Sequence, residues 1–186
     1  QKSNGDWLVF MNSGDCFANT NVLSEVAAHP AANQADTALM FGDKQSTNGN
    51  IIEAIGDASC LLKGELFACH QCIFFRKNVS YDLRYKIFGD YDLLARIYNS
   101  LGTDKIVELG FPIAIFEGGG ISSEISSTKR KEKFLSLYRN FGVGVICQYY
   151  FLNVTNQKKL FSTLLKLLIS VFARCKLSAT KGNASR

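Results

Sequence analysis

Two acidic residues, Asp90 and Asp92, are the first candidates for chemistry, because they stand between an apolar segment and a helical pattern. Residues 93–101 carry leucine and isoleucine at the spacing of one buried helical face, which predicts Asp92 to be an N-cap or first-turn residue. Losing such a residue costs about 1 kcal/mol of stability. Asp90 follows Gly89 and is predicted to lie outside the helix, on a loop that a ligand can approach. The local pattern also fits two acids that only form a turn and a cap.

A polar turn is the second candidate. Residues 12–15 read Asn-Ser-Gly-Asp and directly follow residues 7–11, a continuous apolar run. Such a run predicts a central strand that is buried on both faces of a parallel sheet. Ligands bind at the carboxyl ends of strands in open α/β sheets, so this turn is expected to lie at a binding site. Asp15 fits equally well as a plain turn residue after the strand.

The elements that position these residues follow from the remaining apolar patterns. A hairpin and three more strands are expected, at residues 37–43 with 51–55, and at 72–76, 105–108 and 112–116. A short helix is predicted through Val22 and Val26, and a longer one over residues 91–100 that ends at Gly102. The fold class predicted from these elements is α/β.

Composition indicates a soluble globular protein, with 47% apolar and 20% charged residues in 186. Charge divides the chain into two predicted domains, because residues 1–124 carry a net charge of −6 and residues 125–186 carry +11. Residues 158–176 predict a basic amphipathic helix, which either binds an anionic membrane surface or packs on the sheet. Lys166 interrupts its apolar run, so it is not expected to span a bilayer.

Six cysteines are spread through apolar segments, which favours reduced thiols and a cytoplasmic location. Cys69 and Cys72 form a CxxC motif, but the second pair that a structural zinc site needs is lacking and His70 lies inside the motif, so neither zinc binding nor redox use is expected. Nucleic-acid binding is not expected, because arginine is sparse and no nucleic-acid motif accompanies the basic segment.

Four motifs in a fixed order carry a resemblance to a known family. They are the turn at residues 12–15, His70-Gln71 before Phe74-Phe75-Arg76, Phe-Gly-Asp-Tyr-Asp at residues 88–92, and Gly-Gly-Ile-Ser at residues 119–122. From about Ser3 to Ser123 the chain resembles a bacterial family 2 glycosyltransferase with the GT-A fold. The resemblance implies a partial GT-A (Rossmann-like) mixed sheet flanked by helices, lacking the N-terminal nucleotide-binding part. Residues 1–124 would form this domain, and residues 125–186 a helical basic C-terminal extension.

The resemblance also implies roles for single residues. Asp90 matches the general base of an inverting sugar transfer, and Asp15 matches a ligand of the divalent cation, Mg²⁺ or Mn²⁺, on the donor diphosphate. Asp15 is left as the single anionic ligand, because Asn12 and Gly14 stand where many family members have carboxylates. The residues that would bind donor or acceptor are Asn12, Ser13, His70, Gln71, Gly119 and Gly120.

The implied activity is transfer of a sugar from a nucleotide-sugar donor to a saccharide or lipid-linked acceptor, in the synthesis of cell-surface polysaccharide. The basic extension suggests a peripheral position at the cytoplasmic face of the plasma membrane. The alternative is a non-catalytic fragment that binds a membrane or a partner through its C-terminal helices. On the family pattern, the chain without the nucleotide-binding strands would be inactive alone and prone to aggregate.

Overall fold

The structure, a computed structural model, describes residues 4–116 and 126–154. The chain forms two compact units, Gln1–Ile146 and Cys147–Arg186, and the sheet lies in the first of them. The second unit is described only over the end of one helix, residues 147–154. Gly119, Gly120 and the amphipathic segment 158–176 lie outside the described residues.

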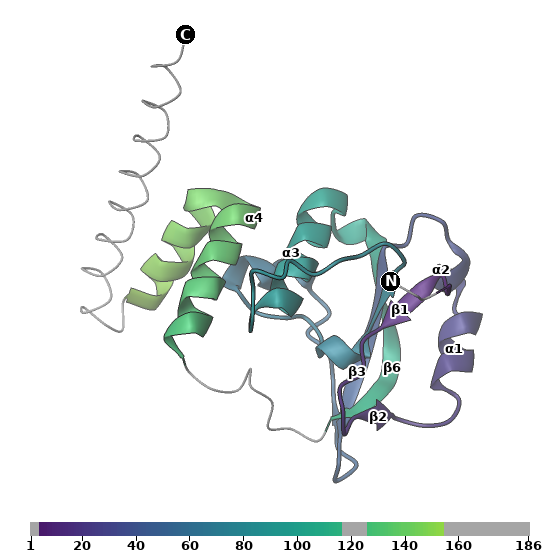
Figure 1. Cartoon of the computed structure of the whole chain (residues 1–186). Helices are drawn as coiled ribbons and strands as arrows, with labels where there is room; N and C mark the ends of the chain where they lie inside the picture. The colour runs from purple at the N-terminus through teal and green to yellow at the C-terminus, as the bar shows by residue number, and fades with distance from the viewer. Residues whose placement is uncertain (1–3, 117–125, 155–186) are drawn as a thin grey trace. The chain divides into compact units, whose positions relative to one another are not determined.

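A mixed six-stranded sheet forms the centre of the first unit (Figure 1). Its order is β1-β5-β3-β6-β2, with β4 paired to β3; the β3–β6 pair is parallel and the other pairs are antiparallel. The predicted α/β class and mixed sheet are confirmed. The strands are β1 (Trp7–Val9), β2 (Cys16–Phe17), β3 (Leu39–Ser46), β4 (Ile51–Ile52), β5 (Ile73–Arg76) and β6 (Ile106–Phe116).

Helices cover both faces of this sheet, with α1 and α2 on one side and α3 on the other (Figure 1). Helix α4 is bent at Gly142, whose φ of 81° is non-helical. The α-helices are α1 (Val22–Ala28), α2 (Pro30–Asn33), α3 (Gly89–Leu101) and α4 (Ser127–Val154). Three 3-10 helices connect the strands, η1 (Ala58–Lys63), η2 (His70–Cys72) and η3 (Thr103–Lys105).

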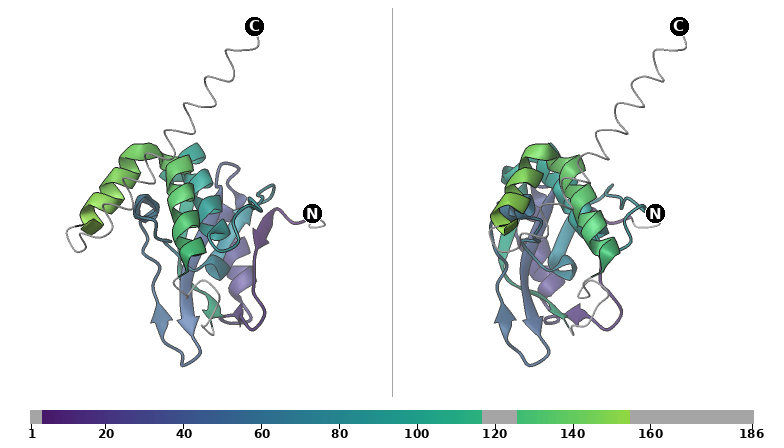
Figure 2. Two further views of the ribbon diagram at one scale, coloured as in Figure 1. Left: turned by 60° about the vertical axis from the view of Figure 1, so that its left-hand side comes forward. Right: turned by 90° about the vertical axis from the view of Figure 1, so that its left-hand side faces the viewer.

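Strands β3 and β5 are the buried centre of the sheet. Consecutive residues of both strands are buried, as expected where helices cover both faces. Met40 and Phe74 pack with Val22 and Val26 of α1, and on the other face the rings of Phe41 and Phe67 meet edge to face. The predicted hairpin is confirmed, because β3 and β4 pair in antiparallel register, and it extends beyond the rest of the sheet in Figure 2.

The prediction for β1 is wrong, because this strand lies at the edge of the sheet and pairs only with β5, in antiparallel register. Its three residues are half-buried. Trp7 is covered without a second strand, since its indole N–H donates to the Ala32 carbonyl at 3.1 Å and the Arg76 guanidinium lies 4.2 Å from its ring centroid. An apolar run of five residues does not distinguish this edge from a central strand.

Strand β6 also differs from the prediction, because the two expected strands are one strand of 11 residues. Gly110, with φ 72°, is accommodated inside it, so the glycine does not end the strand. The register with β3 shifts between Phe41 and Lys44. At that irregularity a side chain on Gly42 would meet the Phe111 carbonyl oxygen 2.4 Å from its Cβ, so only glycine fits.

Helix α3 begins two residues earlier than predicted, with Phe88 as its N-cap residue, so Asp90 lies in the first turn and not on a preceding loop. Asp92 is also in the first turn, as predicted, but it is not a cap. Its side chain is buried and accepts hydrogen bonds from Arg96 Nε at 2.9 Å, Ser136 Oγ at 3.0 Å and Asn140 Nδ2 at 3.1 Å. Asp92 therefore joins α3 to α4.

The substitution Asp92→Asn is expected to lower the free energy of unfolding by about 3 kcal/mol, more than the loss of a cap. The neutral amide removes a charge and directs N–H groups at buried donors. Urea denaturation measures the change, with Asp104→Asn as an exposed control that should stay within about 0.5 kcal/mol. A wild-type midpoint in Asp92→Asn would contradict the structural role.

Candidate functional site

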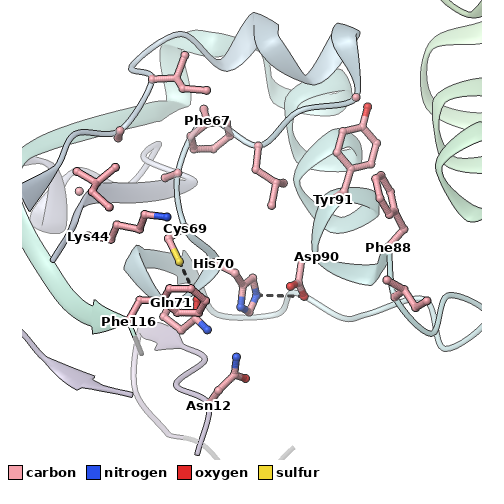
Figure 3. Close-up of a pocket in the computed structure, with 18 of the residues that line it drawn as sticks. Asn12, Lys44, Phe67, Cys69, His70, Gln71, Phe88, Asp90, Tyr91 and Phe116 are labelled. Carbon is pink, nitrogen blue, oxygen red and sulfur yellow. Dashed lines mark hydrogen bonds and ion pairs between the residues drawn. The ribbon is translucent and has the colours of Figure 1, made fainter. Parts of the chain in front are cut away.

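A cavity of about 640 Å³ opens on the side of the sheet that α3 covers, where β3, η2 and the first turns of α3 and α4 meet. Four residues singled out in the sequence line it together: Asn12, His70, Gln71 and Asp90 (Figure 3). Ser13 and Asp15 do not line it. Asp15 is nevertheless tied to it, because its Oδ2 accepts a hydrogen bond from Gln71 Nε2 at 2.9 Å.

Asp90 and His70 face each other across one end of the cavity (Figure 3). Asp90 Oδ1 lies 3.5 Å from His70 Nε2, and the Asp90 side chain is 45% exposed whereas that of His70 is 11% exposed. The imidazole is stacked on Phe10, with ring centroids 5.6 Å apart, and its Nε2 is hydrogen-bonded to the Tyr81 hydroxyl. The tautomer of His70 decides which of these two partners donates. A half-buried aromatic cluster thus lies against an accessible carboxylate.

Burial controls the protonation of this cluster. It lowers the pKa of His70, and the negative charge of Asp90 opposes that shift in part. Burial also raises the pKa of the Tyr81 hydroxyl, and the charge of Asp90 and a hydrogen bond to it act in the same direction. At neutral pH the His70 imidazole is therefore uncharged and the Tyr81 phenol is protonated. Neither group carries a positive charge that would offset the Asp90 carboxylate.

Gln71 connects the cavity wall to the turn that holds Asp15. The residue is 4% exposed, and its amide oxygen accepts a hydrogen bond from Cys69 Sγ at 2.9 Å while its amide nitrogen donates to Asp15. Within residues 4–116 and 126–154 no group of three or more His, Cys, Asp or Glu side chains is arranged to hold a metal.

Three lysines line the cavity that the sequence did not predict to belong to it: Lys44, Lys129 and Lys133. Lys44 directly follows the buried part of β3, and its Nζ lies 5.4 Å from the centroid of the Phe116 ring. Lys129 and Lys133 are four residues apart on α4, a spacing that puts both on one helical face. The four-residue spacing of these two lysines is a sign in the sequence that they share a helical face. It is not distinctive, because the neighbouring residues are also basic. The lysines make the cavity suited to anionic ligands.

Glu132, between the two α4 lysines, holds the start of α3. Its carboxylate accepts backbone N–H bonds from Lys86 at 3.0 Å, Ile87 at 2.8 Å and Phe88 at 2.9 Å. Burial alone would raise the pKa of Glu132, but these donors lower it below its ordinary value. The clamp therefore fixes the turn that presents Asp90 to the cavity.

The chain matches no protein-family model, no curated protein and no solved structure. None of the helices in the described ranges has the length and apolar character that a membrane crossing requires.

Glu132→Gln is expected to destabilise the protein by about 2 kcal/mol near pH 7, because the amide accepts fewer of the three N–H bonds and adds a competing donor. In the wild type, the stability that the Glu132 carboxylate contributes is complete above the ordinary glutamate pKa of 4.5. This stability is lost as the pH falls through the lower pKa that Glu132 has in the folded state. Urea denaturation from pH 7 down to pH 3 should show the variant losing less stability than the wild type over this range. The exposed Glu25→Gln variant should follow the wild type, and an unchanged acid limb in Glu132→Gln would contradict the clamp.

His70 is expected to have a pKa below 6.5, and Asp90→Asn should lower this pKa further by removing the attractive charge. The chain has only two histidines, so their imidazole proton signals can be followed by NMR and assigned with His29→Gln. Since the unfolded state takes up this proton first, stability should fall as the pH drops below 6.5. A His70 signal that titrates at 6.5 or above would show that burial does not dominate.

Proposed function

We propose that the chain is part of a family 2 type glycosyltransferase with the GT-A fold, which moves a sugar from a nucleotide-sugar donor to a saccharide or lipid-linked acceptor with inversion. The observation that supports this function best is the accessible Asp90 carboxylate facing a cavity that three lysines also line. A proton acceptor and fixed positive charge are the two things that such a transfer needs.

In the proposed reaction the acceptor hydroxyl attacks the anomeric carbon of the donor sugar while Asp90 takes the hydroxyl proton. The bond to the nucleoside diphosphate breaks on the opposite face, and the diphosphate leaves. The neutral His70 orients Asp90 without quenching its charge. Lys44, Lys129 and Lys133 offset the charge of the diphosphate. Asn12 and Gln71, on the same wall, offer amide groups to donor or acceptor.

In the proposal, a divalent cation adds to the positive charge of the three cavity lysines. Mg²⁺ or Mn²⁺ on the diphosphate would act as a Lewis acid, with Asp15 as a protein ligand beside diphosphate oxygens and water. Since the described residues form no group of three or more His, Cys, Asp or Glu side chains arranged for a metal, the other ligands of the ion would come from the diphosphate and water. Chelation is therefore expected to weaken donor binding without abolishing it.

Two further aspects of the proposal rest on the sequence. The net charge of +11 over residues 125–186 supports a peripheral position at the cytoplasmic face of the plasma membrane, where an acceptor lipid would be presented. The same charge is what favours the second candidate function, a non-catalytic fragment that binds a membrane or partner. Saturable binding of nucleotide sugars would separate the two, because only the transferase needs it.

Asp90→Asn is expected to remove nearly all sugar transfer while leaving donor affinity within a few-fold, because a proton acceptor acts mainly in the transition state. The assay uses a full-length version that includes the nucleotide-binding part, incubates it with a panel of nucleotide sugars and membrane-derived acceptors, and measures release of nucleoside diphosphate. Asp104→Asn, on the exposed η3 turn, is the matched control and should retain wild-type turnover. Wild-type turnover in Asp90→Asn would remove Asp90 from the reaction. If the unmodified full-length version binds none of the panel, the non-catalytic alternative holds.

Lys44→Met and Lys133→Met are each expected to weaken binding of a nucleoside diphosphate about tenfold, the effect of losing one charge-assisted hydrogen bond. Calorimetric titration with UDP and GDP measures this, and the loss should be smaller at high salt because screening already weakens the wild-type interaction. Lys77→Met is the control, because Lys77 pairs with Asp6 at 2.8 Å and does not line the cavity. Equal affinities in all three variants would contradict a role for the cavity lysines.

A further inference from the structure

Cys69 and Cys72 stand at the two ends of the short 3-10 turn η2, at the wall of the cavity. The backbone N–H of Cys72 donates to the carbonyl oxygen of Cys69 at 2.8 Å. Residues joined by such a turn have Cα atoms within about 7 Å, and a disulfide spans about 4.4–6.8 Å. Both are free thiols. The backbone thus already has a spacing that fits a disulfide.

The two thiols have different surroundings. Cys69 lines the cavity, and Figure 3 shows its sulfur on the cavity side, whereas Cys72 is fully buried in the core with Met40 and Phe74. A reagent in the cavity can reach Cys69 directly. It can reach Cys72 only through Cys69. This arrangement of one accessible and one buried thiol suits an attacking and a resolving cysteine.

Three interactions around the pair favour the thiolate of Cys69, against the hydrogen bond that its thiol donates to Gln71 and the charge of Asp15, which favour the thiol. The Cys72 thiol donates to the Cys69 sulfur, the backbone N–H of Gln71 does so as well, and Lys44 adds positive charge. These effects outweigh burial and bring the pKa of Cys69 to about 7. The hydrogen bond to Cys69 and burial raise the pKa of Cys72, which keeps that proton in place. By contrast, burial raises the pKa of Cys60 to about 11.

We propose that Cys69 and Cys72 form a redox-active dithiol that a peroxide oxidises to a disulfide. The Cys69 thiolate attacks one oxygen of hydrogen peroxide, the O–O bond breaks, and hydroxide leaves, which gives a sulfenic acid on Cys69. The Cys72 sulfur then attacks the Cys69 sulfur, an S–S bond forms, and the S–O bond breaks. The Cys72 proton goes to the leaving hydroxyl, so the second product is water, and an external thiol reverses the reaction by exchange.

Oxidation would change the cavity wall. The disulfide removes the thiol that donates to the Gln71 amide oxygen, and Gln71 is the residue that holds Asp15 through its amide nitrogen. The polar chain Cys69–Gln71–Asp15 therefore loses its first link. The reaction uses neither Asp90 nor a nucleotide sugar, so it stands or falls independently of the proposed sugar transfer.

The test is made on the native chain at pH 7 with one equivalent of hydrogen peroxide, followed by alkylation and peptide mapping by mass spectrometry. The expected product is a Cys69–Cys72 disulfide in most of the chain, which dithiothreitol reverses. In Cys72→Ala the resolving thiol is absent, so a sulfenic acid should accumulate on Cys69 and react with dimedone. Cys16→Ala is the matched control, because Cys16 is exposed on β2 and does not line the cavity. It should form the disulfide to the same extent.

A second measurement needs no variant and no oxidant. The rate of Cys69 alkylation by iodoacetamide should rise through about pH 7, more than one pH unit below the rise seen for an unperturbed thiol such as glutathione. Three results would overturn the proposal: both thiols still alkylated after peroxide, a disulfide between Cys69 and another cysteine, or over-oxidation of Cys69 while Cys72 stays reduced.

Discussion

Two carboxylates, one on α4 and one on α3, join the first turn of helix α3 to α4, and the cavity depends on both. Glu132 of α4 accepts three backbone N–H bonds just before the helix begins, and Asp92 of α3 accepts hydrogen bonds from Ser136 and Asn140 of α4. Buried carboxylates are costly unless such donors satisfy them, so the two helices are fixed in register where they meet. Asp90 lies between these anchor points and faces the cavity, so an exposed acid sits on a rigid support.

Three neighbouring residues at the η2 turn make different kinds of contact around the cavity. Cys69, His70 and Gln71 are consecutive, yet Cys69 pairs with Cys72, His70 meets Asp90, and Gln71 bonds to Asp15. A 3-10 helix turns by about 120° per residue, which separates the directions of neighbouring side chains. The geometry therefore places Cys69 and His70 on one wall of the cavity, with His70 facing Asp90, whereas Cys72 is buried in the core.

Local patterns in the sequence were enough for the elements that depend on neighbouring residues. They predicted the β3–β4 hairpin and the helix after Asp92, whereas the assignment of His70 and Asp90 to one site came from the family resemblance. Local patterns did not predict features that depend on residues distant in the sequence. The apolar run at β1 reads like a central strand, because the cover that Arg76 gives Trp7 comes from another strand. Lysines 129 and 133 read as a solvated charge run, because nothing near them in sequence shows that α4 turns this face to the cavity.

The central claim is that a nucleotide sugar binds in this cavity beside His70 and Asp90. The most direct measurement follows the two histidine imidazole signals by NMR while UDP- and GDP-sugars are titrated into the chain, since His70 lines the cavity and His29 does not. A saturable shift of the His70 signal with the His29 signal unchanged is the predicted result. If no donor moves the His70 signal, or both signals move together in proportion to added ligand, the cavity is not a donor site and the proposed function is contradicted.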